Sequence, residues 1–98
     1  MLTPSVFVPA KNLTFETVSA ELKRFLVLLN KHKKTSVLFD LSQVLQCDSA
    51  GLALLIEAKR LCKLRQQDFL IQNMSNTMTD LATFCGINNL FLGELVND

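Results

Sequence analysis

Few side chains in this sequence of 98 residues could carry out chemistry. His32 is the single histidine and lies in a polar stretch, so a Ser/His/Asp triad and a typical zinc site both lack the residues they need. The chain has no Cys-x-x-Cys motif, and its 3 glycines form no phosphate-binding loop. We therefore expect no catalytic residue, no metal and no cofactor.

The cysteines are the remaining reactive groups. Cys47, Cys62 and Cys85 are odd in number and widely spaced, which favours reduced thiols over a disulfide framework. Cys47 lies just before a predicted helix, where an exposed thiolate would be stabilised and could act as a nucleophile. No general base is evident near it, so packing as small apolar groups is the favoured interpretation for all three.

A basic run contains Lys31, Lys33 and Lys34. Three lysines without interleaved aromatic residues are typical of a solvated turn rather than of a phosphate or nucleic-acid site. The formal net charge of the chain is only +1, so no strong field would attract DNA, an anionic membrane or a highly acidic substrate. We expect no nucleic-acid partner.

The segment with the clearest functional potential is 47–56. Small residues at Ala50 and Gly51 would let another chain approach closely, and the start of the predicted helix offers unpaired N–H groups with a partial positive charge. A phosphate on Ser49 would add a charge of about −1.5 to −2, which those groups could hold but Asp48 would repel, so the residue could be a switch. The alternative is that Asp48 and Ser49 compete simply as N-caps, since capping residues are common.

The helix that begins at this segment is apolar around nearly its whole circumference. The residues responsible are Leu52, Ala53, Leu54, Leu55, Ile56 and Ala58. Such a helix must be covered on two sides, by its own sheet and by something else. Hydrophobic residues make up 49% of the chain, which is rich for a small protein and indicates that some apolar surface faces a partner.

Strands must position this segment, and β-prone runs predict three of them, at residues 5–8, 36–41 and 69–71. The first is bounded by Pro4 and Pro9 and is expected to be a short strand or an edge strand. The second has consecutive apolar residues, which is typical of a strand buried in a parallel sheet. Residues 42–47 are expected to form a loop, and residues 87–95 a last strand or a terminal turn.

Apolar residues at three- and four-residue steps predict three helices. The first begins near Phe15 with Thr14 as its cap, and the second runs from about residue 49 to 64. The third is capped by Ser75, runs through Cys85 and is closed by Gly86 in the left-handed conformation. The first helix is expected to bury Phe15, Val18, Leu22, Phe25, Leu26 and Leu29.

Alternation of strands and helices predicts an α/β fold with parallel strands joined by right-handed crossovers. The length suits one domain, residues 1–98. The longest apolar runs fall far short of the roughly 20 residues that cross a bilayer. Residues 1–4 show no secretory signal, so we expect a cytoplasmic protein without a membrane span.

The second strand and second helix carry a recognisable signature, Asp40-Leu41-Ser42 followed by Asp48-Ser49-Ala50-Gly51-Leu52-Ala53-Leu54-Leu55. This signature resembles that of STAS domains, the family of the bacterial anti-sigma-factor antagonists. The resemblance implies a single non-enzymatic domain with a mostly parallel central sheet and three to four helices. In that family the hydroxyl residue after the aspartate is phosphorylated by a partner kinase or lies at the partner contact. The implied partner-binding residues are Asp48, Ser49, Ala50, Gly51, Leu52 and Leu55, with Ser49 as the possible phosphoacceptor.

Within the family, the compact length and the run 51–55 are most similar to the MlaB type, the STAS subunits of Mla phospholipid ABC transporters. That likeness implies a subunit that binds and stabilises the cytoplasmic ATPase, and so stays peripheral to the inner membrane through an ATPase and permease complex. Its role would be phospholipid transport for lipid asymmetry and outer-membrane maintenance. The alternative is an anti-sigma-factor antagonist switched by phosphorylation of Ser49.

The chain departs from the family at its start. Members commonly open with two strands joined by a turn and carry Gly-Glu-Leu before the first helix, where this chain has Lys11-Asn12-Leu13. The first family strand is therefore missing or swapped. A missing strand would leave an exposed sheet edge, through which two copies could pair as a homodimer.

Overall fold

A computed structural model describes residues 4–33 and 35–96; the first three residues and Lys34 of the basic run lie outside this part. Strands and helices alternate as predicted. Their bounds are β1 Ser5–Phe7, β2 Asn12–Leu13, α1 Val18–Lys31, β3 Val37–Asp40, β4 Gln46–Cys47, α2 Ser49–Leu64, β5 Phe69–Gln72, α3 Asn76–Phe84 and the 3₁₀ helix η1 Asn88–Phe91.

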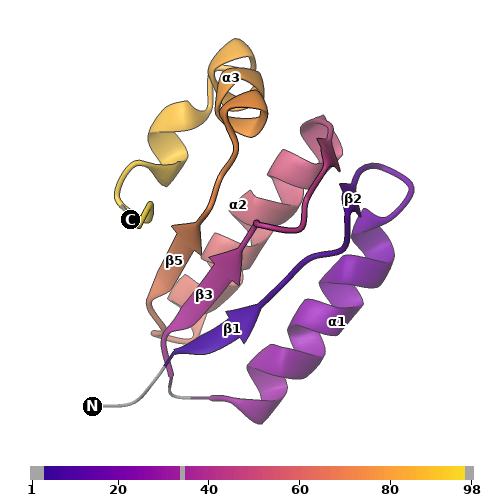
Figure 1. Ribbon diagram of the computed structural model, residues 1–98. Helices are drawn as coiled ribbons and strands as arrows, with labels where there is room; N and C mark the ends of the chain where they lie inside the picture. Colours follow the sequence, from indigo (N-terminus) through magenta and orange to yellow (C-terminus); the bar gives the residue numbers. More distant parts are fainter. Residues whose placement is uncertain (1–3, 34, 97–98) are drawn as a thin grey trace.

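The central sheet has the order β1-β3-β5 with both pairings parallel. α1 and α2 cover one face of it, as Figure 1 shows. The predicted α/β fold with a mostly parallel sheet is thus confirmed, as is the edge position of the first strand. On the face of the sheet opposite to α1 and α2, Val6 lies beside Leu38 and Leu38 beside Leu70.

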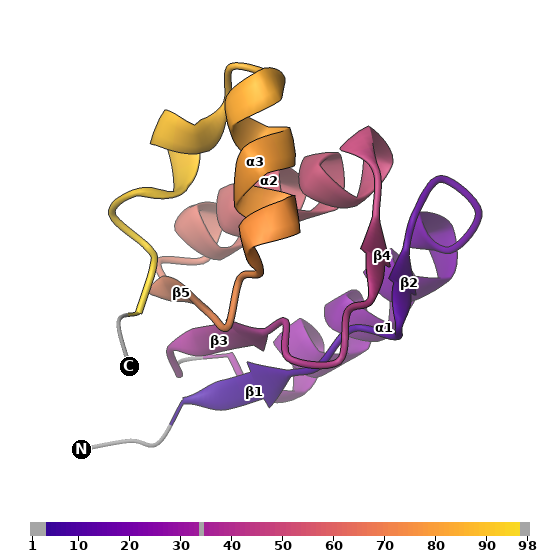
Figure 2. The same cartoon turned by 45° about the horizontal axis from the view of Figure 1, so that its top comes forward.

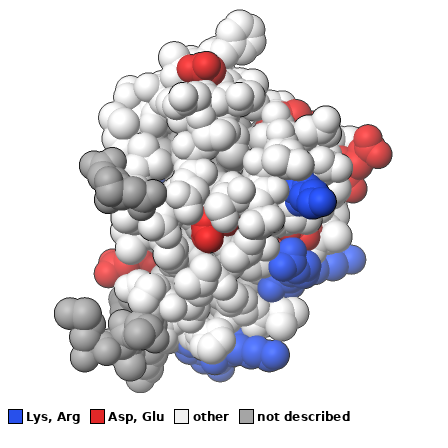
Figure 3. All heavy atoms as spheres, viewed as in Figure 1, with Lys and Arg blue, Asp and Glu red and all other residues white. Residues whose placement is uncertain are grey.

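That opposite face carries no helix in the described part of the chain. Val37 and Phe39 are buried while Leu38 and Asp40 are only half-buried, so burial alternates along β3. The expectation that the consecutive apolar residues are buried on both faces is therefore wrong. Figure 3 shows this side as a largely uncharged surface, with most Lys and Arg atoms toward the α1 side.

β2 and β4 form a second, two-stranded parallel sheet. Figure 2 shows the pair beyond the end of the central sheet, next to the start of α2. Residues 42–47 were expected to be a loop throughout, which is wrong for Gln46 and Cys47. Two-residue strands are too short to show a periodic pattern, so the sequence gives no sign of them.

α1 begins at Val18, three residues later than predicted. The cause is a turn over residues 14–17. The Thr17 hydroxyl accepts a hydrogen bond from the Thr14 N–H at 3.0 Å and donates to the Asn12 carbonyl at 2.7 Å. Phe15 therefore lies outside the helix and is 80% exposed, not buried as predicted.

The C-terminal part agrees with the prediction more closely. Ser75 caps α3 by accepting a hydrogen bond from the Met78 N–H, and Gly86 has a φ of +74° after the helix. Residues 87–95 form both a turn and an extension of the sheet: η1 is followed by a parallel bridge between Leu95 and Ile71. No helix in the described ranges is long and apolar enough to span a membrane.

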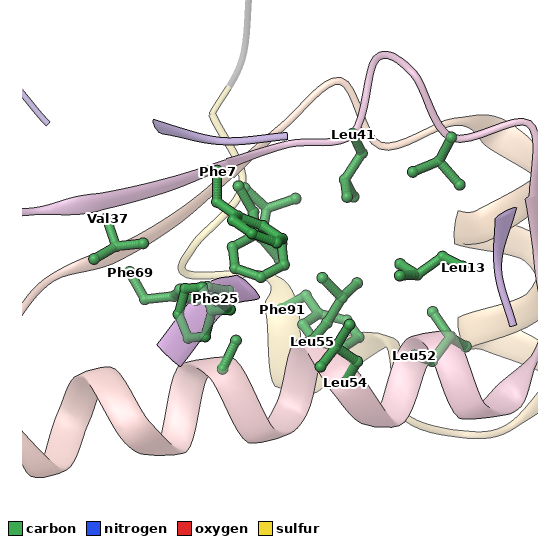
Figure 4. Packing of buried hydrophobic residues seen from close by; sticks show 14 of the residues in the cluster. Phe7, Leu13, Phe25, Val37, Leu41, Leu52, Leu54, Leu55, Phe69 and Phe91 are labelled. Carbon is green, nitrogen blue, oxygen red and sulfur yellow. The ribbon is translucent and has the colours of Figure 1, made fainter. Parts of the chain in front are cut away.

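Four phenylalanine rings form the centre of the core between the sheet and α1. Phe39 contacts Phe7, Phe25 and Phe69, with ring centroids 4.9–5.3 Å apart in tilted or edge-on arrangements. Such pairs contribute beyond the apolar area that they bury. Figure 4 shows Leu52, Leu54 and Leu55 extending from α2 toward the sheet in the same core.

We expect Phe39→Ala to lower the free energy of unfolding by about 3–5 kcal/mol, because it removes a fully buried ring and leaves a cavity. Urea denaturation followed by circular dichroism measures this. Phe84→Ala is the matched control, since Phe84 is 89% exposed, and should change stability by less than about 0.5 kcal/mol. Equal effects of the two variants would contradict the packing described.

Candidate partner-binding site

The start of α2 lies beyond the carboxyl-terminal ends of β3 and β5, beside the β2–β4 pair (Figure 2). Asp48 is its N-cap, and Ser49 is the first helical residue. One oxygen of the Asp48 carboxylate accepts hydrogen bonds from the N–H groups of Ala50 at 2.9 Å and Gly51 at 3.2 Å. Of the two competing caps, Asp48 takes the position.

The second carboxylate oxygen of Asp48 reaches a different segment. It accepts a hydrogen bond from the Phe15 N–H at 3.0 Å, in the turn that precedes α1. This bond, followed by those from Gly51 and Ala50, lowers the pKa of the Asp48 carboxyl below its usual 3.8, because each N–H stabilises the charged form. Asp48 thus ties α1 to the start of α2.

Gly51 is held in the tightest contact at the site. A Cβ built at this position would lie 2.1 Å from the Leu13 carbonyl oxygen and 2.7 Å from the Cys47 sulfur. β2 and β4 therefore pack directly on the first turn of α2, which only glycine permits. The small residue predicted to admit a partner instead admits the protein's own backbone.

Leu52 and Leu55 were predicted to contact a partner, but both are fully buried in the core. The neighbours that cover α2 are the sheet, α1 and α3 of the same chain. The apolar circumference of this helix is thus explained mainly by internal packing. We leave the two leucines out of the surface that a partner could touch.

The exposed part of the site comprises Ser49 and Ala53, with Ala50 half-buried between them. Beside these residues an apolar groove of about 260 Å³ runs between α1 and α2. Its lining is Val18, Ser19, Leu22, Ala50, Ala53, Leu54 and Glu57. The site therefore combines the exposed hydroxyl of Ser49, which the sequence analysis identified, with a neighbouring apolar groove.

The α1 side of this groove was not foreseen. Val18 and Leu22 were assigned to the buried face of the first helix, and both are only half-buried. One sequence does not show that Val18 and Leu22 lie near Ala50 and Ala53, because that depends on how the two helices pack. The available signal was the absence of large side chains at Ala50 and Ala53.

The N–H groups of three residues at the start of α2 are already occupied. Those of Ala50 and Gly51 donate to the Asp48 side chain, and that of Leu52 donates to the Asp48 carbonyl at 3.2 Å. They are therefore not free to hold a phosphate on Ser49, as the sequence suggested they could. Within the described residues the Ser49 hydroxyl makes no hydrogen bond.

The cysteine thiols and the single histidine lie in different surroundings. Burial, followed by the charge of Asp48, raises the pKa of the Cys47 thiol to about 11, so the proposed stabilised thiolate is wrong and packing is supported. Burial also raises the pKa of Cys62 to about 11. His32 lies at the C-terminus of α1 and is exposed. In the described ranges no group of His, Cys, Asp and Glu could hold a metal.

Comparison with protein families gives a match over residues 11–96 to the family described as Mlab, STAS domain. Comparison with curated proteins gives no significant match. Among solved structures, the anti-sigma factor antagonist SpoIIAA in its unphosphorylated form has a TM-score of 0.70 and 16% identity, covering 100% of this chain and 85% of that one. The Bacillus cell fate determinant SpoIIAA in the phosphorylated form has a TM-score of 0.65 and 17% identity, covering 100% and 88%. At this identity the likeness shows the fold.

We predict that Gly51→Ala destabilises the protein by about 1–3 kcal/mol or more, because the added methyl group collides with the Leu13 carbonyl and must push β2 away. Thermal unfolding measures the loss. Gly93→Ala is the control, since no atom lies within 4 Å of a Cβ built there, and should be nearly neutral. A neutral Gly51→Ala would show that β2 does not pack on α2.

Asp48→Asn should lower stability most at neutral pH. The folded-state pKa of Asp48 lies below its usual 3.8, so the charged carboxylate stabilises the fold above that value. This contribution is lost as the pH falls through the folded-state pKa. Urea midpoints from about pH 7 to pH 3 should therefore show the difference between wild type and Asp48→Asn shrinking in acid.

Ser49→Ala provides the control for this titration, because serine has no charge to lose. Its difference from wild type should stay constant over the same range of pH. If the stability difference between wild type and Asp48→Asn is equally constant, the ionised Asp48 carboxylate does not stabilise the fold through its hydrogen bonds from Phe15, Ala50 and Gly51.

Proposed function

The chain belongs to the STAS domain family of the Mlab type, and from this premise we propose that it is a non-catalytic subunit that binds and stabilises the ATPase of an ABC phospholipid transporter. In this proposal it lies in the cytoplasm, at the inner membrane only through the ATPase and permease complex. The observation that supports it is the exposed Ser49 beside an apolar groove, on a helix start held rigidly by Asp48.

The groove suits one apolar side chain of the partner. Its walls are the aliphatic side chains of Val18, Leu22 and Leu54, and the alanines of α2 leave room above them. An aromatic or aliphatic anchor in such a pocket typically provides much of the binding energy of an interface. Ser49 is exposed and directly precedes Ala50 of the lining, so its hydroxyl could form a hydrogen bond to a partner bound there.

Rigidity of this surface favours binding. The Asp48 carboxylate fixes the start of α2 against the turn before α1, and Gly51 fixes it against β2. A surface held in its bound conformation loses little conformational entropy when the partner docks. The proposed contact therefore comprises Ser49, Ala50 and Ala53 with the groove, supported from beneath by Asp48 and Gly51.

A second candidate function uses the same surface. The fold resembles SpoIIAA, which is described in unphosphorylated and phosphorylated forms. Ser49 is exposed and could accept a phosphate from a kinase, which would make this protein a phosphorylation-switched antagonist of an anti-sigma factor. The two functions differ in the partner and in whether Ser49 is modified.

The proposed surface predicts that Ser49→Arg and Ala53→Arg each weaken binding to the ATPase by tenfold or more, because a long charged side chain would fill the groove entrance. Copurification of the tagged protein with the ATPase, followed by titration, measures the loss. Leu64→Arg is the matched control: it introduces the same side chain at the other end of α2, where Leu64 is exposed, and should bind normally. Normal binding by both groove variants would eliminate this surface.

Recovery of partners from native cytoplasm and detergent-solubilised membranes distinguishes the two functions. An ABC ATPase recovered with its permease supports the transporter subunit. A small kinase, together with a phosphate that Ser49→Ala fails to gain in the presence of ATP, supports the antagonist and excludes the transporter role.

A further inference from the structure

The open edge of β1 has a hydrogen-bonding pattern that matches a second copy of itself. In a parallel pair, alternate residues turn their N–H and C=O toward the neighbouring strand. The Ser5 N–H donates to the Ser36 carbonyl at 2.8 Å, so Ser5 and Phe7 face β3 and Val6 faces away from it. In the described part of the chain, the N–H and C=O of Val6 have no partner.

The groove along this edge is accessible and mixed in character, because Arg24, Lys31 and His32 line it beside the aliphatic side chains. It has a volume of about 570 Å³ and lies between β1 and α1. Val6 is 48%, Val8 36% and Val27 54% exposed, so three aliphatic side chains face solvent around one edge. The other edge of the sheet is closed, because Ile71 of β5 exchanges hydrogen bonds with the segment 94–96.

We propose that two copies of this chain associate through antiparallel pairing of β1 with β1, centred on Val6, to form one continuous six-stranded sheet. In this register the two Val6 residues exchange both N–H to C=O hydrogen bonds, and each Val8 N–H donates to the carbonyl of Pro4 in the other copy. The proposal concerns a surface that shares no residue with the Ser49 site, so it is independent of the proposed function.

The positions of the prolines and of Arg24 specify this register. Pro4 has no N–H and so cannot donate to the Val8 carbonyl of the other copy. That carbonyl already accepts a hydrogen bond from the Arg24 guanidinium within its own chain, at 3.3 Å. Arg24 is held in place by Glu21 at 2.7 Å and lies over the Phe7 ring. In this register the outward N–H groups of Val6 and Val8 each donate to a free carbonyl of the other copy. The Val8 carbonyl receives no donor from the other copy, but it accepts the hydrogen bond from Arg24 of its own chain.

The side chains agree with this pairing. Val6 continues a row across the open face of the sheet through Leu38 to Leu70, and the second copy would double this row. On the helix side the groove is lined by Val27 and Leu28 together with the basic Arg24 and Lys31 and the C-cap His32, and the α1 of the second copy would approach there. Four backbone hydrogen bonds and a few aliphatic contacts make a small interface, so the dimer should be weak and depend on concentration.

Sedimentation of the full chain from about 5 µM to 1 mM should show a monomer–dimer equilibrium. Val6→Pro removes the outward N–H without removing a hydrogen bond to β3, and should raise the dissociation constant at least tenfold. A wild-type protein that stays monomeric over the whole range overturns the proposal, as does a Val6→Pro protein that dimerises normally.

Cross-linking tests the register even where the proline variant fails to fold. In a Cys85→Ser background, Val6→Cys places two thiols on directly opposed residues whose Cα atoms are about 5.5 Å apart, within the range of a disulfide. Val8→Cys is the matched control, because it opposes Pro4 and the two Val8 positions lie roughly 13 Å apart along the strands. Mild oxidation should give a covalent dimer at least tenfold faster for Val6→Cys; equal rates overturn the register.

Discussion

The hydrogen bonds of one carboxylate, that of Asp48, hold the turn before α1 against the start of α2. Asp48 accepts N–H groups from the first turn of α2 and from a turn 33 residues earlier in the chain. Among the described residues, the same two segments are also joined by the two-residue pairing of β2 with β4, by a hydrogen bond from the Asp48 N–H to the Leu13 carbonyl and by the contact of Gly51 with that carbonyl. This side chain therefore links the turn just before α1, which forms one wall of the groove, to the start of α2, which forms the other.

Gly51 is the second residue on which the contact between the turn before α1 and the start of α2 depends. The carboxylate pulls the turn at 14–17 toward α2, and the absence of a side chain at Gly51 lets the Leu13 carbonyl come into contact with the helix. A larger residue would separate β2 from β4 and would also lengthen the reach from Asp48 to Phe15. The Asp-Ser-x-Gly order is therefore a packing requirement as much as a functional one, with the serine left as the exposed position.

The sequence predicted the elements that depend on long patterns and missed those that depend on tertiary contacts. The amphipathic runs and the caps at Asp48 and Ser75 defined α2 and α3, since capping and periodicity are local properties. The late start of α1 followed from a hydroxyl bridge between Thr17 and Asn12 and from the capture of the Phe15 N–H, neither of which has a sequence signature. For the same reason the sequence could not show which residues after Ser49 reach the surface: Leu52 and Leu55 follow the serine in sequence but turn into the core.

The occupied helix start determines what a phosphate at Ser49 would do. Because Asp48 already takes the N–H groups of Ala50 and Gly51, a phosphate would meet a carboxylate while these two backbone donors are not free to offset the repulsion. The modification would then act on the surface, by placing a bulky dianion on the residue that precedes Ala50 of the apolar groove. A partner that seats an apolar side chain in that groove would be released. The same geometry is thus compatible with a permanent contact in an unmodified subunit and with a reversible one in an antagonist, and the partner decides between the two.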